Sequence, residues 1–92
     1  MTASFKHRGL KRLYENGDRA GIRADLRDKV ERILTLLDVA EALEALDLPG
    51  YRLHQLHGRL RGYWAVTVRA NWRIIFRFAG GQVQEVELID YH

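Results

Sequence analysis

Cysteine is absent from the 92-residue sequence, and proline occurs only once, at Pro49. Without cysteine the chain cannot form disulfide bridges, use a thiolate nucleophile or bind a metal through cysteine ligands. No apolar run approaches the roughly 18–20 residues that a membrane-spanning helix needs, and the N-terminal segment lacks the apolar core of a signal peptide. These absences favour a cytoplasmic protein without membrane contact. The length predicts one domain over residues 1–92.

Acidic residues are missing between Leu48 and Gln84, where every basic residue is an arginine. These arginines are Arg52, Arg59, Arg61, Arg69, Arg73 and Arg77. A guanidinium group matches phosphate oxygens in pairs, so this segregation of charge favours a surface that binds a polyanion. The alternative is an arginine-rich surface that is solvated and has no partner.

The first half of the chain has helical periodicity. The spacing of Leu10, Leu13 and Tyr14 predicts a helix that ends at Gly17. A second amphipathic helix is predicted by aliphatic residues at steps of three or four, which are Ile22, Leu26, Val30, Ile33 and Leu37. Asp38 and Glu41 have the spacing of a capping box, which predicts a short helix through about Leu46.

The second half has the alternation of strands. We expect strands over Tyr51–His57, Gly62–Arg69, Trp72–Phe78 and Val83–Ile89. The tight connections Ala70-Asn71 and Gly80-Gly81 indicate hairpins. The sequence therefore predicts an α+β fold, with N-terminal helices packed on an antiparallel sheet of about four to five strands.

The predicted sheet has two contrasting faces. One face is apolar and contains Trp64, Val66, Val68, Ile74, Phe76 and Phe78. Alternation places Thr67, Arg69, Arg73, Ile75 and Arg77 on the opposite face. Either Arg77 and one neighbour pair with Glu85 and Glu87 on the next strand, or the arginines bind phosphate.

Asp90, Tyr91 and His92 continue the last predicted strand, and His54 and His57 lie on the first. Metal-free cleavage of RNA needs a base for the 2′-hydroxyl, cations for the developing phosphorane and an acid for the leaving 5′-oxygen, and these residue types supply all three. The alternative is a solvated terminal histidine without a catalytic role. A metal at His54 and His57 is not expected, because residues three apart on a strand face opposite sides.

Four segments, Ser4–Lys11, Leu48–His54, Gly62–Ile74 and Asp90–His92, resemble the HigB toxins of the RelE superfamily. The resemblance implies a compact α+β toxin of a type II toxin–antitoxin system. Such toxins are ribosome-dependent mRNA endonucleases that cut codons in the A site of the 30S subunit, with adenine-rich codons favoured. The implied catalytic residues are His54, Arg73, Asp90, Tyr91 and His92, and the implied phosphate contacts are His57, Arg59, Arg61 and Arg69. Many family members have lysine where this chain has His57, and the loop with Arg59 and Arg61 is more basic than usual.

The preferred hypothesis makes His92 or His54 the base and Arg73 the group that stabilises the transition state. Asp90 would orient a histidine or help to take the proton, and Tyr91 would donate to the leaving oxygen or stack on a nucleobase. The products would be a 2′,3′-cyclic phosphate and a 5′-hydroxyl. No cofactor or metal is expected.

The resemblance also implies partners. These are a HigA-like helix-turn-helix antitoxin, the ribosome with its mRNA, and operator DNA only through the antitoxin complex. The main alternative function is a non-catalytic, basic RNA- or DNA-binding module that uses the same arginines. A third interpretation is a purely structural subunit of a regulatory complex.

Overall fold

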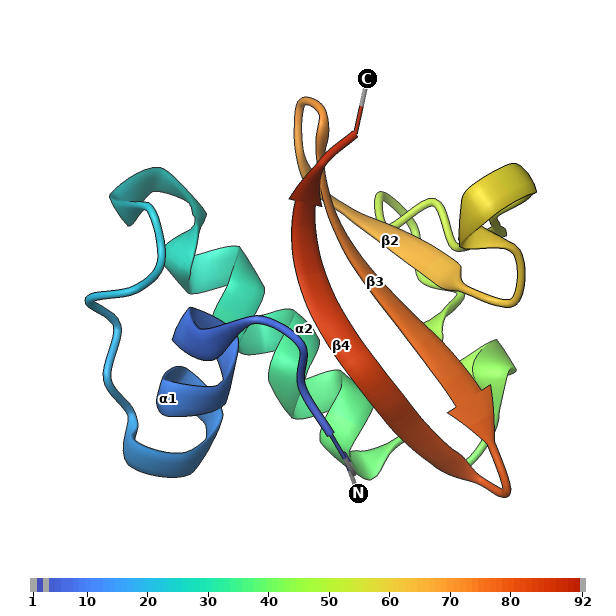
Figure 1. Cartoon of the computed structure of the whole chain (residues 1–92), viewed down its shortest axis with the longest axis horizontal. Helices are drawn as coiled ribbons and strands as arrows, with labels where there is room; N and C mark the ends of the chain where they lie inside the picture. Colours follow the sequence, from blue (N-terminus) through green and yellow to red (C-terminus); the bar gives the residue numbers. More distant parts are fainter. Residues whose placement is uncertain (1, 3, 92) are drawn as a thin grey trace.

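The computed structural model describes Thr2 and residues 4–91, in which a helical layer covers one face of a four-stranded sheet. The helices are α1 (Arg8–Asn16) and α2 (Arg27–Val39), with short 3₁₀ turns η1 (Ala24–Leu26), η2 (Leu43–Leu46) and η3 (Gly58–Leu60). The strands are β1 (His54–Gln55), β2 (Trp64–Arg69), β3 (Trp72–Ala79) and β4 (Gln82–Asp90), antiparallel in the order β1-β2-β3-β4. Figure 1 shows α1 and α2 on one side of the sheet and η3, in yellow, on the other. The predicted α+β class is confirmed.

Helix α1 ends where the sequence predicts. Gly17 follows its last turn with a φ of 69°, and the Gly17 N–H donates to the Leu13 carbonyl at 3.0 Å. Only glycine adopts this left-handed conformation without steric cost. At the other end, Nδ1 of His7 accepts a hydrogen bond from the Leu10 N–H at 3.1 Å and caps the first turn.

The second predicted helix is confirmed in its buried face, but not in its start. All five predicted aliphatic residues are buried, yet α2 begins only at Arg27. Ile22 and Leu26 therefore reach the core from the preceding loop and from η1.

The prediction that Asp38 begins a capping box is wrong. Asp38 lies inside α2, and its carboxylate accepts hydrogen bonds from the Tyr14 hydroxyl at 2.5 Å and from the Thr2 N–H at 3.2 Å. Partners that are distant in the sequence satisfy this side chain, so it does not begin a new helix.

Strands β2, β3 and β4 match the predicted segments closely, whereas the predicted strand over Tyr51–His57 is reduced to two residues. Arg52 interrupts it with a φ of 54°, a left-handed conformation that a regular strand does not contain. Single backbone bonds on either side still join the segment to the β2 region, from the Thr67 N–H to Tyr51 and from the Leu56 N–H to Tyr63.

The main core lies between the sheet and the helices. The sheet contributes side chains from β2, β3 and β4, namely Val66, Val68, Ile74, Phe76, Val83, Val86 and Leu88. A smaller cluster of Leu56, Tyr63, Ala65 and Ile75 occupies the opposite face of the sheet, which we call the distal face. Among the described residues, no helix has the length and apolar character needed to cross a membrane.

Candidate functional site

His54 and Arg73 lie in neighbouring rows of the distal face. His54 is paired with Ala65, and Ala65 with Ile75, so these residues form one row across the sheet. Arg73, between Thr67 and Ile89, belongs to the next row. Since directly opposite residues point to the same face, the side chains of His54 and Arg73 project on the same side of the sheet.

The backbone orients the His54 ring. Its Nδ1 lies 2.8 Å from the Arg52 carbonyl oxygen. A carbonyl oxygen only accepts, so Nδ1 carries the proton and Nε2 of the neutral ring has a lone pair. His54 is exposed, and this nitrogen can therefore accept a proton from a bound substrate.

Arg73 is half-buried and is also held by backbone groups. Its Nη1 donates to the carbonyl oxygens of Ala70 at 2.6 Å and of Trp72 at 3.2 Å. Its Nε is buried and has no hydrogen-bond partner within the described part of the chain. These bonds orient the guanidinium before substrate binds. A cation that is already oriented can stabilise the negative charge of a transition state without a free-energy cost of reorganisation.

Tyr91 joins the distal face at the end of β4. Its N–H donates to the Asn71 carbonyl at 2.7 Å, so backbone pairing extends past Asp90. The Tyr91 side chain is 41% exposed and lines a hollow of about 390 Å³ together with His57, Arg59 and Leu60. The structure thus brings three predicted site residues, Tyr91, His57 and Arg59, to one place.

Arg77 does not serve as a free cation on this face. Its Nε lies 3.1 Å from the Glu85 carboxylate, and its guanidinium carbon lies 4.4 Å from the centroid of the Tyr63 ring. Lys6 approaches the same carboxylate at 3.5 Å. Of the predicted pairing, the part between Arg77 and Glu85 is confirmed, whereas the other base at this carboxylate is Lys6 rather than a second arginine of the sheet. Arg61 is exposed, and its carbonyl accepts a bond from Arg77 at 3.5 Å.

Asp90 and Arg69 lie on the helical side of the sheet rather than on the distal face. Asp90 sits between Ile89 and Tyr91 on β4 and is paired with Trp72, which packs against the main core. For Arg69 the face predicted from alternation is wrong, because the register shifts between Thr67 and Arg69 and ends the strict alternation. Asp90 and Arg69 line a separate hollow of about 350 Å³, together with Arg23, Asp25, Ala70, Asn71 and Trp72. His92 lies outside the described residues.

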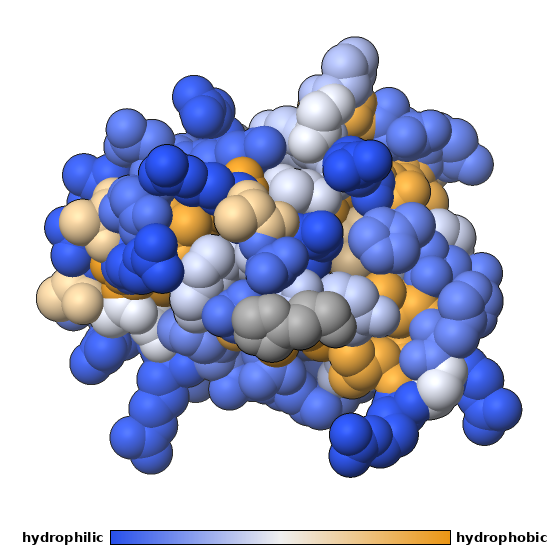
Figure 2. All heavy atoms as spheres, turned by 90° about the horizontal axis from the view of Figure 1, so that it is seen from above, coloured by the Kyte–Doolittle hydropathy of each residue, from blue (hydrophilic) through white to orange (hydrophobic). Residues whose placement is uncertain are grey.

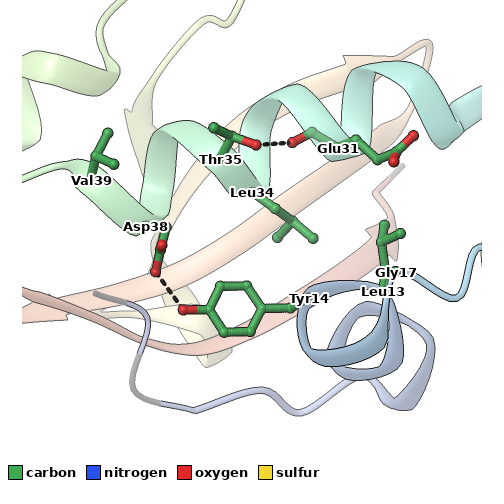
Figure 3. Close-up of a pocket in the computed structure, with 8 residues that line it drawn as sticks. All are labelled: Leu13, Tyr14, Gly17, Glu31, Leu34, Thr35, Asp38 and Val39. Carbon is green, nitrogen blue, oxygen red and sulfur yellow. Dashed lines mark hydrogen bonds between the residues drawn. The ribbon is translucent and has the colours of Figure 1, made fainter.

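A third hollow, of about 290 Å³, opens between α1 and α2 (Figure 3). Leu13, Tyr14 and Leu34 line it, and the carboxylates of Glu31 and Asp38 add acidic groups. The hydrogen bond to Asp38 raises the pKa of Tyr14 and lowers that of Asp38. None of the predicted site residues lines this hollow.

No three His, Asp or Glu side chains among the described residues gather closely enough to hold a metal ion. Sequence reasoning missed Arg23, Asp25 and Trp72 beside Asp90. No local signal marks them, because their proximity depends on the packing of η1 against the end of the sheet.

Two solved structures have this architecture. A YafQ mutant from E. coli has a TM-score of 0.61 and 20% identity, and the match covers 96% of this chain and 91% of that one. A chain of the YoeB–YefM complex of Staphylococcus aureus also has a TM-score of 0.61, with 16% identity over 100% of this chain and 98% of that chain. Helices on one face of a four-stranded antiparallel sheet thus define the fold class that this protein shares with both structures.

Sequence comparison identifies the family within this class. Residues 3–92 match the family of HigB-like toxins, described as RelE-like toxins of type II toxin–antitoxin systems. The endoribonuclease HigB of Proteus vulgaris is 44% identical over 92 residues, which are 100% of both chains. Toxin HigB-1 of Vibrio cholerae serotype O1 is 32% identical over 83 residues, covering 88% of this chain and 87% of that protein. The chain belongs to the HigB-like toxin family.

Proposed function

We propose that this toxin is an endoribonuclease that cuts mRNA in the A site of the 30S ribosomal subunit. The observation that carries the proposal is the full-length similarity, at 44% identity, to a protein named endoribonuclease HigB. The distal face supports it, because an oriented histidine, a fixed arginine and an exposed tyrosine lie on one side of the sheet.

In the proposed reaction, Nε2 of His54 or the ring of His92 takes the proton of the ribose 2′-hydroxyl. The 2′-oxygen attacks phosphorus, and the bond to the 5′-oxygen breaks, leaving a 2′,3′-cyclic phosphate. Arg73 stabilises the charge on the phosphorane, and Tyr91 donates a proton to the leaving oxygen or stacks on a nucleobase. Asp90 orients a histidine or helps to take the proton. His57, Arg59, Arg61 and Arg69 contact RNA phosphates, and no cofactor takes part.

We further propose that the toxin acts in the cytoplasm and is neutralised by a HigA-like helix-turn-helix antitoxin. The family consists of toxins of toxin–antitoxin systems, and the related YoeB structure is a complex with YefM. Operator DNA would be bound through the antitoxin.

Primer extension on programmed ribosomes tests the reaction. We expect His54→Ala, Arg73→Ala and deletion of His92 each to lower the cleavage rate by on the order of 10²–10⁴-fold. Arg32→Ala removes an exposed arginine of α2 and serves as the matched control for charge. Cleavage of free mRNA as fast as ribosome-bound mRNA would contradict the role of the ribosome. RNA binding without cleavage by the unaltered chain would favour a non-catalytic binding module.

A further inference from the structure

We propose that Arg23 is a positioning residue that holds the Asp90 carboxylate in place for RNA cleavage. The proposal rests on the function proposed above, because it assigns Asp90 to the reaction. Arg23 lies in the loop that precedes η1, far from Asp90 in the sequence, and the fold places both beside one hollow at the end of β4.

The carboxylate of Asp25 holds the guanidinium group of Arg23. Its Nε lies 2.7 Å from one oxygen of Asp25, and its Nη2 lies 2.8 Å from the other. A guanidinium bound to both oxygens of a carboxylate has a defined orientation as well as a neutralised charge. The side chain of Arg23 is nevertheless 61% exposed, whereas that of Asp25 is 30% exposed. The guanidinium is therefore fixed but accessible from the hollow.

Trp72 connects Arg23 to Asp90. The guanidinium carbon of Arg23 lies 5.7 Å from the centroid of the Trp72 ring, within the range of a cation–π contact. Trp72 is the residue directly opposite Asp90 in the β3–β4 pairing, so both side chains project on the same side of the sheet. Arg23 thus lies over the strand position at which Asp90 emerges.

The two positive and two negative side chains around the hollow sum to zero charge. They are the carboxylates of Asp90 and Asp25 and the guanidinium groups of Arg23 and Arg69, with Arg69 lying 3.4 Å from Asp25. In such a balanced set, each guanidinium can be oriented by a carboxylate of the same set. The hydrogen bonds to Asp25 raise the pKa of Arg23, and the negative charge of Asp90 adds to this effect.

The position of this network matters because Tyr91 follows Asp90 directly. One step along the backbone separates the hollow on the helical side from the distal face, so an Asp90 side chain that lost its orientation would disturb the site at the same strand end.

The end of the molecule seen in Figure 2 is mostly hydrophilic, with an apolar area to one side. RNA can therefore approach this end without crossing a large apolar surface.

The test compares Arg23→Ala, Arg23→Lys and the control Arg32→Ala in the full-length protein. We expect Arg23→Ala to lower kcat for ribosome-bound mRNA by on the order of 10²-fold with KM little changed. Loss of a nearby positive charge makes a carboxylate easier to protonate, so the acidic limb of the pH–rate profile should move to higher pH. Arg23→Lys keeps the positive charge, so the acidic limb of its pH–rate profile should lie where it does in the unaltered protein. Its kcat should recover only in part, because lysine lacks the planar guanidinium group of arginine.

A second measurement does not depend on activity. At a fixed pH of 7, the NMR chemical shift of the side-chain carboxyl carbon of Asp90 should differ between Arg23→Ala and the unaltered protein, because a neighbouring charge has been removed. Arg32→Ala should leave this chemical shift unchanged. An unaltered toxin that fails to cleave, combined with a changed Asp90 signal in Arg23→Ala, would refute the proposed function while leaving the Arg23–Asp90 coupling intact. A cleavage rate and an Asp90 signal in Arg23→Ala equal to those of Arg32→Ala would overturn the positioning role. If Arg23→Ala fails to fold, Arg23→Lys and Asp25→Asn give the same comparison.

Discussion

At the scale of single residues, the backbone rather than other side chains orients the two best-placed candidate groups. The Arg52 carbonyl sets the tautomer of His54, and the carbonyls of Ala70 and Trp72 hold Arg73. Two of these carbonyls belong to residues with positive φ, Arg52 at 54° and Ala70 at 50°. Uncommon backbone conformations of this kind are found more often at functional sites, where they aim a group at a target.

The resemblance to HigB toxins implies a lysine in many members at the position of His57, so we expect this residue to affect how the toxin binds RNA. It lies with Arg59 and Tyr91 around one hollow of the distal face. Lysine stays charged through the neutral range, whereas an imidazole gains its charge on acidification. We expect His57→Lys to tighten binding of single-stranded RNA at pH 8 and to steepen the salt dependence by about 0.7 in log–log slope. Fluorescence anisotropy at several salt concentrations measures both. A salt dependence that stays the same in His57→Lys would count against phosphate contact at this position.

At the scale of elements, helix α1 depends on the protonation state of His7. Its Nδ1 accepts from the Leu10 N–H, which requires a ring that is unprotonated at this atom. Burial lowers the pKa of His7 below its ordinary value of 6.5. A group with a lowered pKa in the folded state contributes stability above its unfolded pKa and loses that contribution as the pH falls through the folded value.

We therefore expect the free energy of unfolding to fall by about 1 kcal/mol from this cap as the pH drops below 6.5. His7→Asn keeps a side chain that caps at any pH, so its stability should decline less over the same interval. Urea unfolding at several pH values above 5 compares the two proteins while most carboxylates stay ionised. Parallel pH curves for the two proteins would show that His7 does not act as the cap.

Close contact between α1 and the loop before η1 makes Gly9 sensitive to substitution. A Cβ at Gly9 would lie 2.6 Å from the Gly21 carbonyl oxygen, a backbone atom that cannot move aside easily. Gly9→Ala should thus destabilise by about 1–3 kcal/mol, although alanine is the better helix former. Gly17→Ala is the comparison, because nothing lies within 4 Å there and only the positive φ opposes the change. Chemical denaturation measures both, and a stabilised Gly9→Ala variant would contradict the close packing.

At the scale of the whole molecule, one core joins the helical layer to the sheet. Leu26 and Ile33 are each 1% exposed within it. Leu26→Ala or Ile33→Ala should cost about 2–5 kcal/mol, a large share of the roughly 5–15 kcal/mol by which a domain is stable. Val39→Ala, at a position that is 68% exposed on α2, should change stability little. Denaturation midpoints in an Asp90→Asn background, which we expect to suppress toxicity, provide the measurement. Equal midpoints for Ile33→Ala and Val39→Ala would mean that the helical face is not core.

Periodicity and turn residues were enough to predict most of the elements. The end of α1 at Gly17, strands β2, β3 and β4, and the buried face of α2 depend on neighbours in the sequence, through backbone conformation and alternation. The segregation of charge and the residue types of the candidate site could also be predicted, because they are properties of the sequence itself.

Tertiary contacts decided the rest. Asp38 stays inside α2 because Tyr14 and Thr2 bind its carboxylate, and Arg69 leaves the distal face because a register shift interrupts β2. The grouping of Arg23, Asp25 and Trp72 beside Asp90 joins the loop before η1 to the end of the sheet. Each of these features depends on partners that are remote in the sequence, and local patterns do not encode which remote groups meet.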